Sequence, residues 1–93
     1  MITDKKRFNG FANRATWATV IWGQVDESIY KECIHLASYY RYDLKQYKDR
    51  MVYLLKTTGW SRDVRNERHN IAWLEVRNHF TNEIHYDRGG NSQ

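Results

Sequence analysis

Residues 13–22, NRATWATVIW, form the most apolar run of the chain and decide its fold. Placed on a helix at about 100° per residue, their apolar side chains cover roughly 220° of the circumference. Thr16, Thr19 and Gly23 fill the remaining arc, and Gly23 is expected to end the helix. A stripe this wide is typical of a helix with neighbours on several sides, so residues 13–23 are predicted to be the central helix of a small helical domain.

Capping residues and apolar stripes predict further helices around the first, which itself begins at Asn13. Asp26 begins the predicted helix 27–40, whose apolar positions fall within one arc. Asp43 begins the predicted helix 44–57, and its buried stripe is expected to contain Leu44, Tyr47, Met51, Leu54 and Leu55.

The segment that follows, residues 61–69, is polar, and Val64 is its one apolar residue. A helix that is polar all round is held weakly, so the segment is either a short solvated helix or a long loop. Asn70 then begins the last predicted helix, 71–85, with a stripe of Trp73, Val76, Phe80 and Ile84. Together these patterns predict an all-α fold, a compact bundle of four to five short helices.

The composition favours one small intracellular domain spanning residues 1–93. Hydrophobic residues make up 41% of the chain, and aromatic residues, at 15%, supply large buried areas from few positions. No apolar run is long enough to span a bilayer, so no membrane partner is expected. A single cysteine excludes an internal disulfide and favours the cytoplasm. The basic arm 1–8 and the tail 87–93 are predicted to be flexible.

Candidate catalytic groups are explained better by packing or solvation. Cys33 lies in the middle of an apolar stripe, which predicts a buried structural thiol rather than a nucleophile. The four histidines have none of the short spacings of metal ligands on a helix. No glycine-rich phosphate loop is present. The sequence therefore predicts a protein that is not an enzyme and that takes no metal or cofactor.

The most informative surface is basic and aromatic. Fifteen Lys and Arg against eleven Asp and Glu give a net charge of +4. If residues 61–69 are helical, Arg62, Arg65 and Arg68 share one face with His69. Partner- or phosphate-binding candidates are Trp60, Arg62, Arg65, Arg68, Arg77, Lys5, Lys6 and Arg7, with Tyr39 and Tyr42 as a second exposed surface.

Three interpretations of this surface remain open. The arginines could be solvated and paired with Asp63, Glu67 and Glu75. They could be the hot spots of a protein interface, which are rich in Arg, Trp and Tyr. They could contact the phosphates of a nucleic acid, with aromatic residues stacking on bases. A homodimer is compatible with each interpretation.

The central stretch also resembles a set of small, largely uncharacterised proteins from bacteriophages and their bacterial hosts. The shared pattern is N-x-x-T-W-x-x-V-x-W, followed by Asp26-Glu27 and Tyr30. The resemblance extends to residues 8–11, FNGF, and to the later Trp73-x-Glu75-Val76 and Phe80. This chain differs from the pattern of those proteins at Arg14 and Ala15, where they have Tyr-Glu, and at Ala18, where they have Asn.

The resemblance implies an all-helical phage-type protein but carries no established activity. Small phage proteins often bind a host machine or a defence complex. We therefore expect a non-enzymatic binding protein, in the host cytoplasm if phage-encoded, that inhibits or redirects a host protein or nucleoprotein complex. Counter-defence of the anti-CRISPR or anti-restriction kind is the favoured version, and a small basic nucleic-acid-binding helical module is the alternative.

Overall fold

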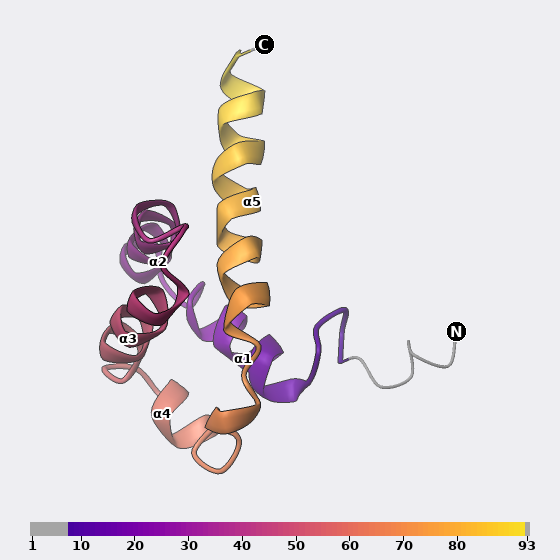
Figure 1. Ribbon diagram of the computed structural model, residues 1–93, viewed down its shortest axis with the longest axis vertical. Coiled ribbons are helices and arrows are strands. Elements are labelled where there is room, and N and C mark those ends of the chain that lie inside the picture. The colour runs from indigo at the N-terminus through magenta and orange to yellow at the C-terminus, as the bar shows by residue number, and fades with distance from the viewer. Residues whose placement is uncertain (1–7, 93) are drawn as a thin grey trace.

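The computed structural model describes the backbone of residues 8–92 and the side chains of residues 8–82. All the secondary-structure elements of this part of the chain are helices, which confirms the predicted all-α fold. The elements are α1 (Arg14–Trp22), α2 (Glu27–Tyr39), α3 (Leu44–Leu55), α4 (Trp60–Asp63), the short 3-10 helix η2 (Arg68–Asn70) and α5 (Trp73–Ser92). Helices α2 and α3 pack against each other and against α5, and α1 lies across the base of α5 (Figure 1).

The predicted caps of the first three helices are confirmed. The side chains of Asn13, Asp26 and Asp43 each accept a hydrogen bond from the backbone N–H three residues on, at 2.9, 2.9 and 3.1 Å. These bonds satisfy donors that the first turn of a helix leaves without a partner. Sequence reasoning therefore located three helix starts to the residue.

The predicted start and end of the last helix are wrong. Asn70 does not cap it but lies in η2, and its carbonyl accepts a hydrogen bond from Asn13 Nδ2 at 2.7 Å. Helix α5 begins at Trp73 and continues to Ser92, so it takes in residues 87–92 of the predicted tail. No helix in the described part of the chain has both the length and the apolarity needed to cross a lipid bilayer.

The buried face of α1 differs from the predicted one. Thr16 and Thr19 are fully buried, whereas Ile21 is 44% exposed and Trp17 and Trp22 are half-buried. Helix α1 does have several neighbours, since it packs against α4, η2 and α5. However, α5 is the helix on which both α2 and α3 pack, so α1 shares the central position with α5.

Hydrogen bonds explain how two threonines enter the core. Thr19 Oγ1 donates to the carbonyl of Ala15 at 2.8 Å, and Thr16 Oγ1 donates to Asn13 Oδ1 at 2.8 Å. A hydroxyl that is satisfied within its own helix can be buried at low cost. Thr16 Oγ1 also accepts from the backbone N–H of Ala72, at 2.9 Å, and so joins α1 to the start of α5.

Helix α3 is shorter and more exposed than predicted. It ends at Leu55, and the hydroxyls of Thr57 and Thr58 donate to the carbonyls of its last turn. Leu44, expected in the buried stripe, is 39% exposed, and Leu54 is half-buried. Tyr47, Met51 and Leu55 are fully buried, as predicted.

Gly23 ends α1 as predicted, but for a reason of space rather than of backbone angle. Its φ of −73° is open to any residue. A Cβ at this position would lie 2.8 Å from Phe80 Cζ and 3.1 Å from Cys33 Sγ. Glycine is therefore required because α2 and α5 approach the end of α1 closely.

Candidate binding site

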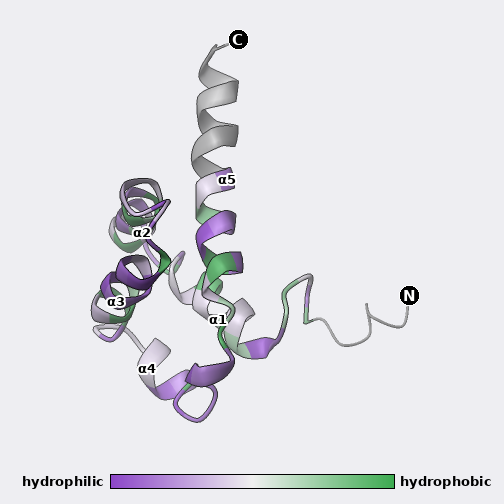
Figure 2. Ribbon diagram, in the orientation of Figure 1, coloured by the Kyte–Doolittle hydropathy of each residue, from purple (hydrophilic) through white to green (hydrophobic). Residues whose placement is uncertain are grey.

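The polar segment between α3 and α5 is neither of the two predicted forms. Helix α4 ends at Asp63, a turn covers residues 64–67, and η2 follows. The segment does not continue as one helix. Three of its residues are buried and hold it against the core: Trp60, Val64 and Ile71. The polar residues between these anchors stay outside, which Figure 2 shows as a hydrophilic stretch next to α4 at the bottom of the view.

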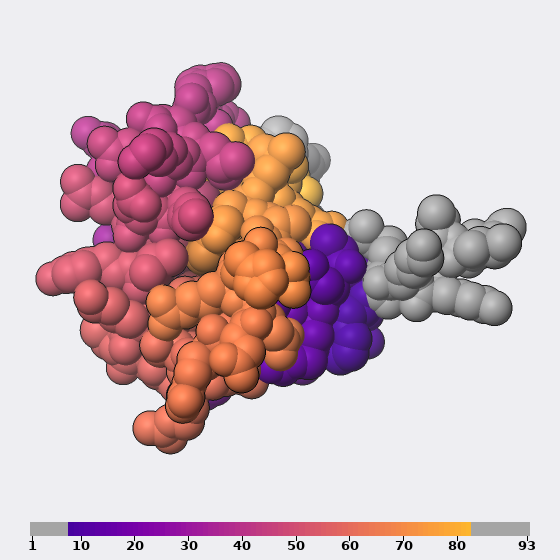
Figure 3. Space-filling model, turned by 60° about the horizontal axis from the view of Figure 1, so that its bottom comes forward, coloured from indigo at the N-terminus to yellow at the C-terminus, as the bar shows by residue number. Residues whose placement is uncertain are grey.

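This break changes the geometry of the predicted arginine cluster. Arg62 lies on α4, Arg65 lies in the turn, and Arg68 lies on η2, so they do not share the face of one helix as the helical prediction required. All three side chains are nevertheless exposed. Figure 3 shows this part of the chain coming forward as a ridge beside α1. We call Arg62, Arg65 and Arg68 the arginine face.

The acidic residues of the same segment are paired with Arg14 of α1. Arg14 Nη2 lies 2.9 Å from Asp63 Oδ1 and 3.4 Å from Glu67 Oε2. Trp22 Nε1 donates to the second oxygen of Asp63 at 2.8 Å. The hydrogen bonds from Trp22 and Arg14 hold the pKa of Asp63 below its usual value, and the bond to Asp63 raises the pKa of Arg14.

The interpretation in which the arginines pair with local carboxylates is therefore wrong for Asp63 and Glu67. The third predicted carboxylate, Glu75, accepts a hydrogen bond from the backbone N–H of Ala12 at 2.8 Å. Among the side chains that the structure describes, no carboxylate lies within salt-bridge distance of any member of the arginine face. Its three positive charges are therefore exposed and not held in a local ion pair within this part of the chain.

Trp60 is one of the predicted binding residues, and the structure does not place it as an open contact surface. Its side chain is fully buried, and its indole Nε1 donates to Thr19 Oγ1 at 2.9 Å. The guanidinium of Arg68 covers its ring, with Cζ 4.7 Å from the ring centroid, and Arg68 Nη2 donates to Ser61 Oγ. Trp60 thus positions Arg68 by a cation–π contact instead of meeting a partner itself.

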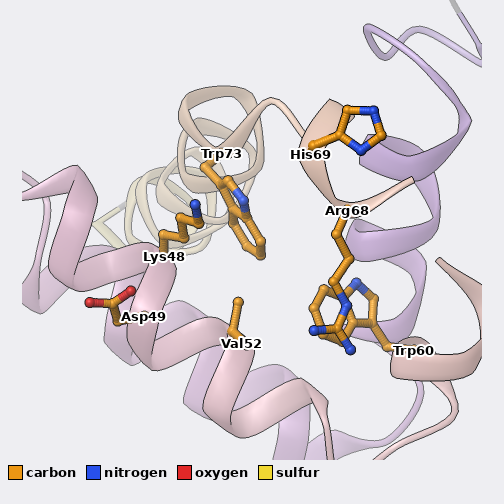
Figure 4. A pocket seen from close by; sticks show the side chains of 7 residues that line it. All are labelled: Lys48, Asp49, Val52, Trp60, Arg68, His69 and Trp73. Carbon is orange, nitrogen blue, oxygen red and sulfur yellow. The ribbon is translucent and has the colours of Figure 1, made fainter. Parts of the chain in front are cut away.

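Arg68 also lines a groove between α3 and the segment that contains α4 and η2. The groove has a volume of about 370 Å³ and is lined by Lys48, Asp49, Val52, Trp60, Arg68, His69 and Trp73. Figure 4 shows Lys48 and Arg68 on opposite walls, with Trp73 between them. We call this feature the Trp60–Trp73 groove.

Sequence reasoning missed most of the groove. Lys48 is not part of the buried stripe predicted for helix 44–57, whereas Trp73 is part of the stripe predicted for the last helix. The structure agrees, since Lys48 is exposed and Trp73 is 8% exposed. No spacing in the sequence relates the two residues, because the packing of α3 against α5 brings them together. Only Trp60 and Arg68 of the lining were among the predicted binding residues.

Arg77, Tyr39 and Tyr42, three further predicted site residues, do not line this groove. Arg77 is half-buried and donates to the carbonyl of Arg41 and to Asn78 Oδ1, so it ties α5 to the α2–α3 connection. Tyr39 and Tyr42 are 71% and 91% exposed, as expected of a second surface. Lys5, Lys6 and Arg7 lie outside the described residues.

The thiol and the candidate metal ligands of the described residues do not form a chemical site. Cys33 is fully buried, and burial, followed by the charge of Glu32, raises the pKa of its thiol to about 12. A thiol in this state is a poor nucleophile. Among the described side chains, no three His, Cys, Asp or Glu groups converge in a way that could hold a metal ion.

Comparisons with known proteins found no relative of this chain. No protein-family model, curated protein sequence or solved structure matches the chain. The arginine face and the groove beside it are therefore interpreted from their own geometry and charge.

Proposed function

We propose that this protein is a non-enzymatic binding protein that attaches, through the arginine face, to an acidic surface of a host protein or nucleoprotein complex and inhibits or redirects it. The observation that carries the proposal is the pairing of Arg14 with Asp63 and Glu67. Arg14 engages both acids of the segment, and neither of them forms an ion pair with Arg62, Arg65 or Arg68, whose guanidinium groups are exposed to a partner. Arginine is suited to this role because its planar fork of donors matches carboxylates and phosphates.

Two further observations support a binding protein over an enzyme. The one thiol in the chain is buried in the core, away from the groove lining. The groove beside the arginine face is lined by basic and apolar side chains and one carboxylate, a composition common in recognition sites. The phage-type resemblance of residues 8–30 adds the expectation that the partner is a bacterial one, with counter-defence as the first version to test.

The test is a pull-down from bacterial lysate with the immobilised full-length chain. The test variant is Arg62→Gln with Arg65→Gln, which removes two charges from the arginine face and leaves Arg68 in place. The matched control is Lys31→Gln with Lys56→Gln, which removes two exposed charges from α2 and the end of α3. We expect one specific partner to be retained by the wild type and the control and to be lost by the test variant.

Two results would contradict the proposal: no specific protein retained at physiological salt, or equal retention by the test variant. Nuclease treatment of the lysate separates the alternative, a nucleic-acid-binding module. That alternative requires retention to depend on nucleic acid, affinity to fall steeply with salt, and the salt slope to flatten by about one unit for each lost arginine.

A further inference from the structure

We propose that the Trp60–Trp73 groove is a recognition pocket for an acidic peptide segment of the partner, with a carboxylate held between Lys48 and Arg68 and a neighbouring apolar side chain on Val52 and Trp73. This inference rests on the proposed binding function and names the chemistry of the ligand. Exposed arginines alone would bind any anion, whereas a groove with two cations on opposite walls and an apolar floor selects for shape as well as charge.

Arg68 is held ready for such a ligand. Its guanidinium rests on the ring of Trp60 at 4.7 Å, and its Nη2 is bonded to Ser61. Trp60 is itself fixed by its bond to Thr19 in the core. A guanidinium fixed in this way has N–H donors left for a carboxylate and loses little side-chain freedom on binding.

The opposite wall supplies a second positive charge. Lys48, on α3, extends into the groove toward Trp73 (Figure 4). The one carboxylate in the lining, Asp49, points away from the groove in the same view, and its Oδ2 lies 3.7 Å from Lys45 Nζ, one helical turn back. Lys48 and Arg68 outnumber Asp49, the one carboxylate of the lining, so the lining carries a net positive charge.

The state of the two tryptophans favours a peptide over a nucleic acid. Single-stranded nucleic acids are held by bases that stack on open aromatic faces. Trp60 is fully buried beneath Arg68, and Trp73 is 8% exposed, so neither ring offers a face to a base. Val52, which is half-buried, and the small exposed part of Trp73 form instead a shallow apolar floor, which suits a side chain next to a carboxylate.

The experiment is an NMR titration of the full-length, ¹⁵N-labelled protein in about 100 mM salt, where long-range surface electrostatics are screened. Three probes are compared: a short capped peptide of glutamate, aspartate and one phenylalanine; the same peptide with glutamine and asparagine in place of the acids; and a short oligothymidine. We expect only the acidic peptide to shift the Arg68 Nε–H and Trp73 indole signals. The indole signal of Trp17, which does not line the groove, is the internal reference.

Variants then assign the binding to the groove. Lys48→Gln is expected to weaken the acidic peptide by about threefold to tenfold, and Asp49→Asn to strengthen it by up to about threefold. Lys56→Gln removes the same charge from the end of α3, outside the groove, and should leave the affinity unchanged. The spectrum of each variant reports directly that it is folded.

Three outcomes overturn the inference: no groove signal shifts with the acidic peptide, Lys48→Gln binds as the wild type does, or oligothymidine shifts the groove signals more strongly than the peptide. These outcomes are separable from the pull-down. A lysate partner that depends on Arg62 and Arg65 but not on Lys48 would retain the proposed function and refute the groove. Peptide binding in the groove without any lysate partner would support the groove as a recognition pocket and refute the proposed function.

Discussion

The indole N–H of Trp60 donates to the hydroxyl of Thr19 across 2.9 Å in the core, joining two residues 41 positions apart. Both side chains are fully buried, so neither group can turn to water. The bond orients Trp60 on α4, and Trp60 in turn supports Arg68 at the surface. A core hydrogen bond on α1 is thus connected, through one aromatic ring, to the candidate binding site.

Thr19→Val should destabilise the protein by about 1–3 kcal/mol, because the indole donor of Trp60 would remain buried without an acceptor. Urea denaturation followed by circular dichroism measures the change. Thr57→Val is the matched control, since its hydroxyl bonds only to the carbonyl of Leu54 at the surface. That variant should stay within about 0.5 kcal/mol of the wild type. Equal effects of the two substitutions would contradict the role assigned to Thr19.

Asp63 should make the protein less stable in acid. Its pKa in the folded state lies below the ordinary value of 3.8, so the unfolded chain takes up the proton first. The stabilisation is therefore complete above about pH 5 and is lost as the pH falls through the unfolded and then the folded pKa. Because the Asp63 side chain is 34% exposed, the contribution is expected to be only about 0.5–1 kcal/mol.

Comparison with Asp63→Asn isolates this contribution. The free energy of unfolding of the variant should fall less steeply than that of the wild type between about pH 5 and pH 2, since one titrating carboxylate is gone. Parallel curves for the two proteins over this range would show that the bonds from Trp22 and Arg14 do not stabilise the ionised carboxylate.

Gly23→Ala should destabilise the protein by about 1–3 kcal/mol through overpacking. The new methyl group would lie 2.8 Å from Phe80 Cζ, in a core with no room for it. Phe80→Leu removes the opposing ring, so the alanine should cost less in the Phe80→Leu background than in the wild type. A double-mutant cycle by thermal or urea denaturation measures this coupling. Additive effects would mean that the contact with Phe80 does not set the cost.

Cys33 should resist alkylation until the protein unfolds. Burial raises the pKa of its thiol to about 12, so at pH 8 little thiolate forms and the reagent cannot reach it. Iodoacetamide labelling followed by mass spectrometry should show slow modification in native buffer and rapid modification in concentrated urea. Rapid labelling of the native protein, at the rate of a free cysteine, would contradict the buried placement.

Much of the secondary structure could be predicted because it depends on neighbouring residues. Asn13, Asp26 and Asp43 cap helices through bonds to an N–H three residues on, and such bonds require no tertiary contact. The stripe of α2 that contains Cys33 is buried, and so is the stripe of α3 that contains Tyr47 and Met51, as their spacing indicates. These relationships are short in sequence, so a pattern along the chain records them.

The errors occur where distant residues decide the outcome. Thr16 and Thr19 bond within their own helix, and Ala72 and Trp60 supply the second partners that hold them in the core. Ile21 stays 44% exposed because none of the described elements covers it fully. A hydropathy pattern assigns the threonines outward and the isoleucine inward, since it contains no record of such partners. The burial of Trp60 depends in the same way on a distant residue, since its indole N–H donates to Thr19.

The sequence by itself determined an all-α domain, the starts of its first three helices, a buried thiol and a basic surface, because capping, periodicity and charge are properties of short stretches. Only the tertiary structure decided which charged side chains are paired with one another and which are exposed to a partner. It pairs Asp63 and Glu67 with Arg14, and it places Lys48 opposite Arg68 across a groove. Charge pairing and concavity depend on which side chains folding brings together, and no local pattern specifies them.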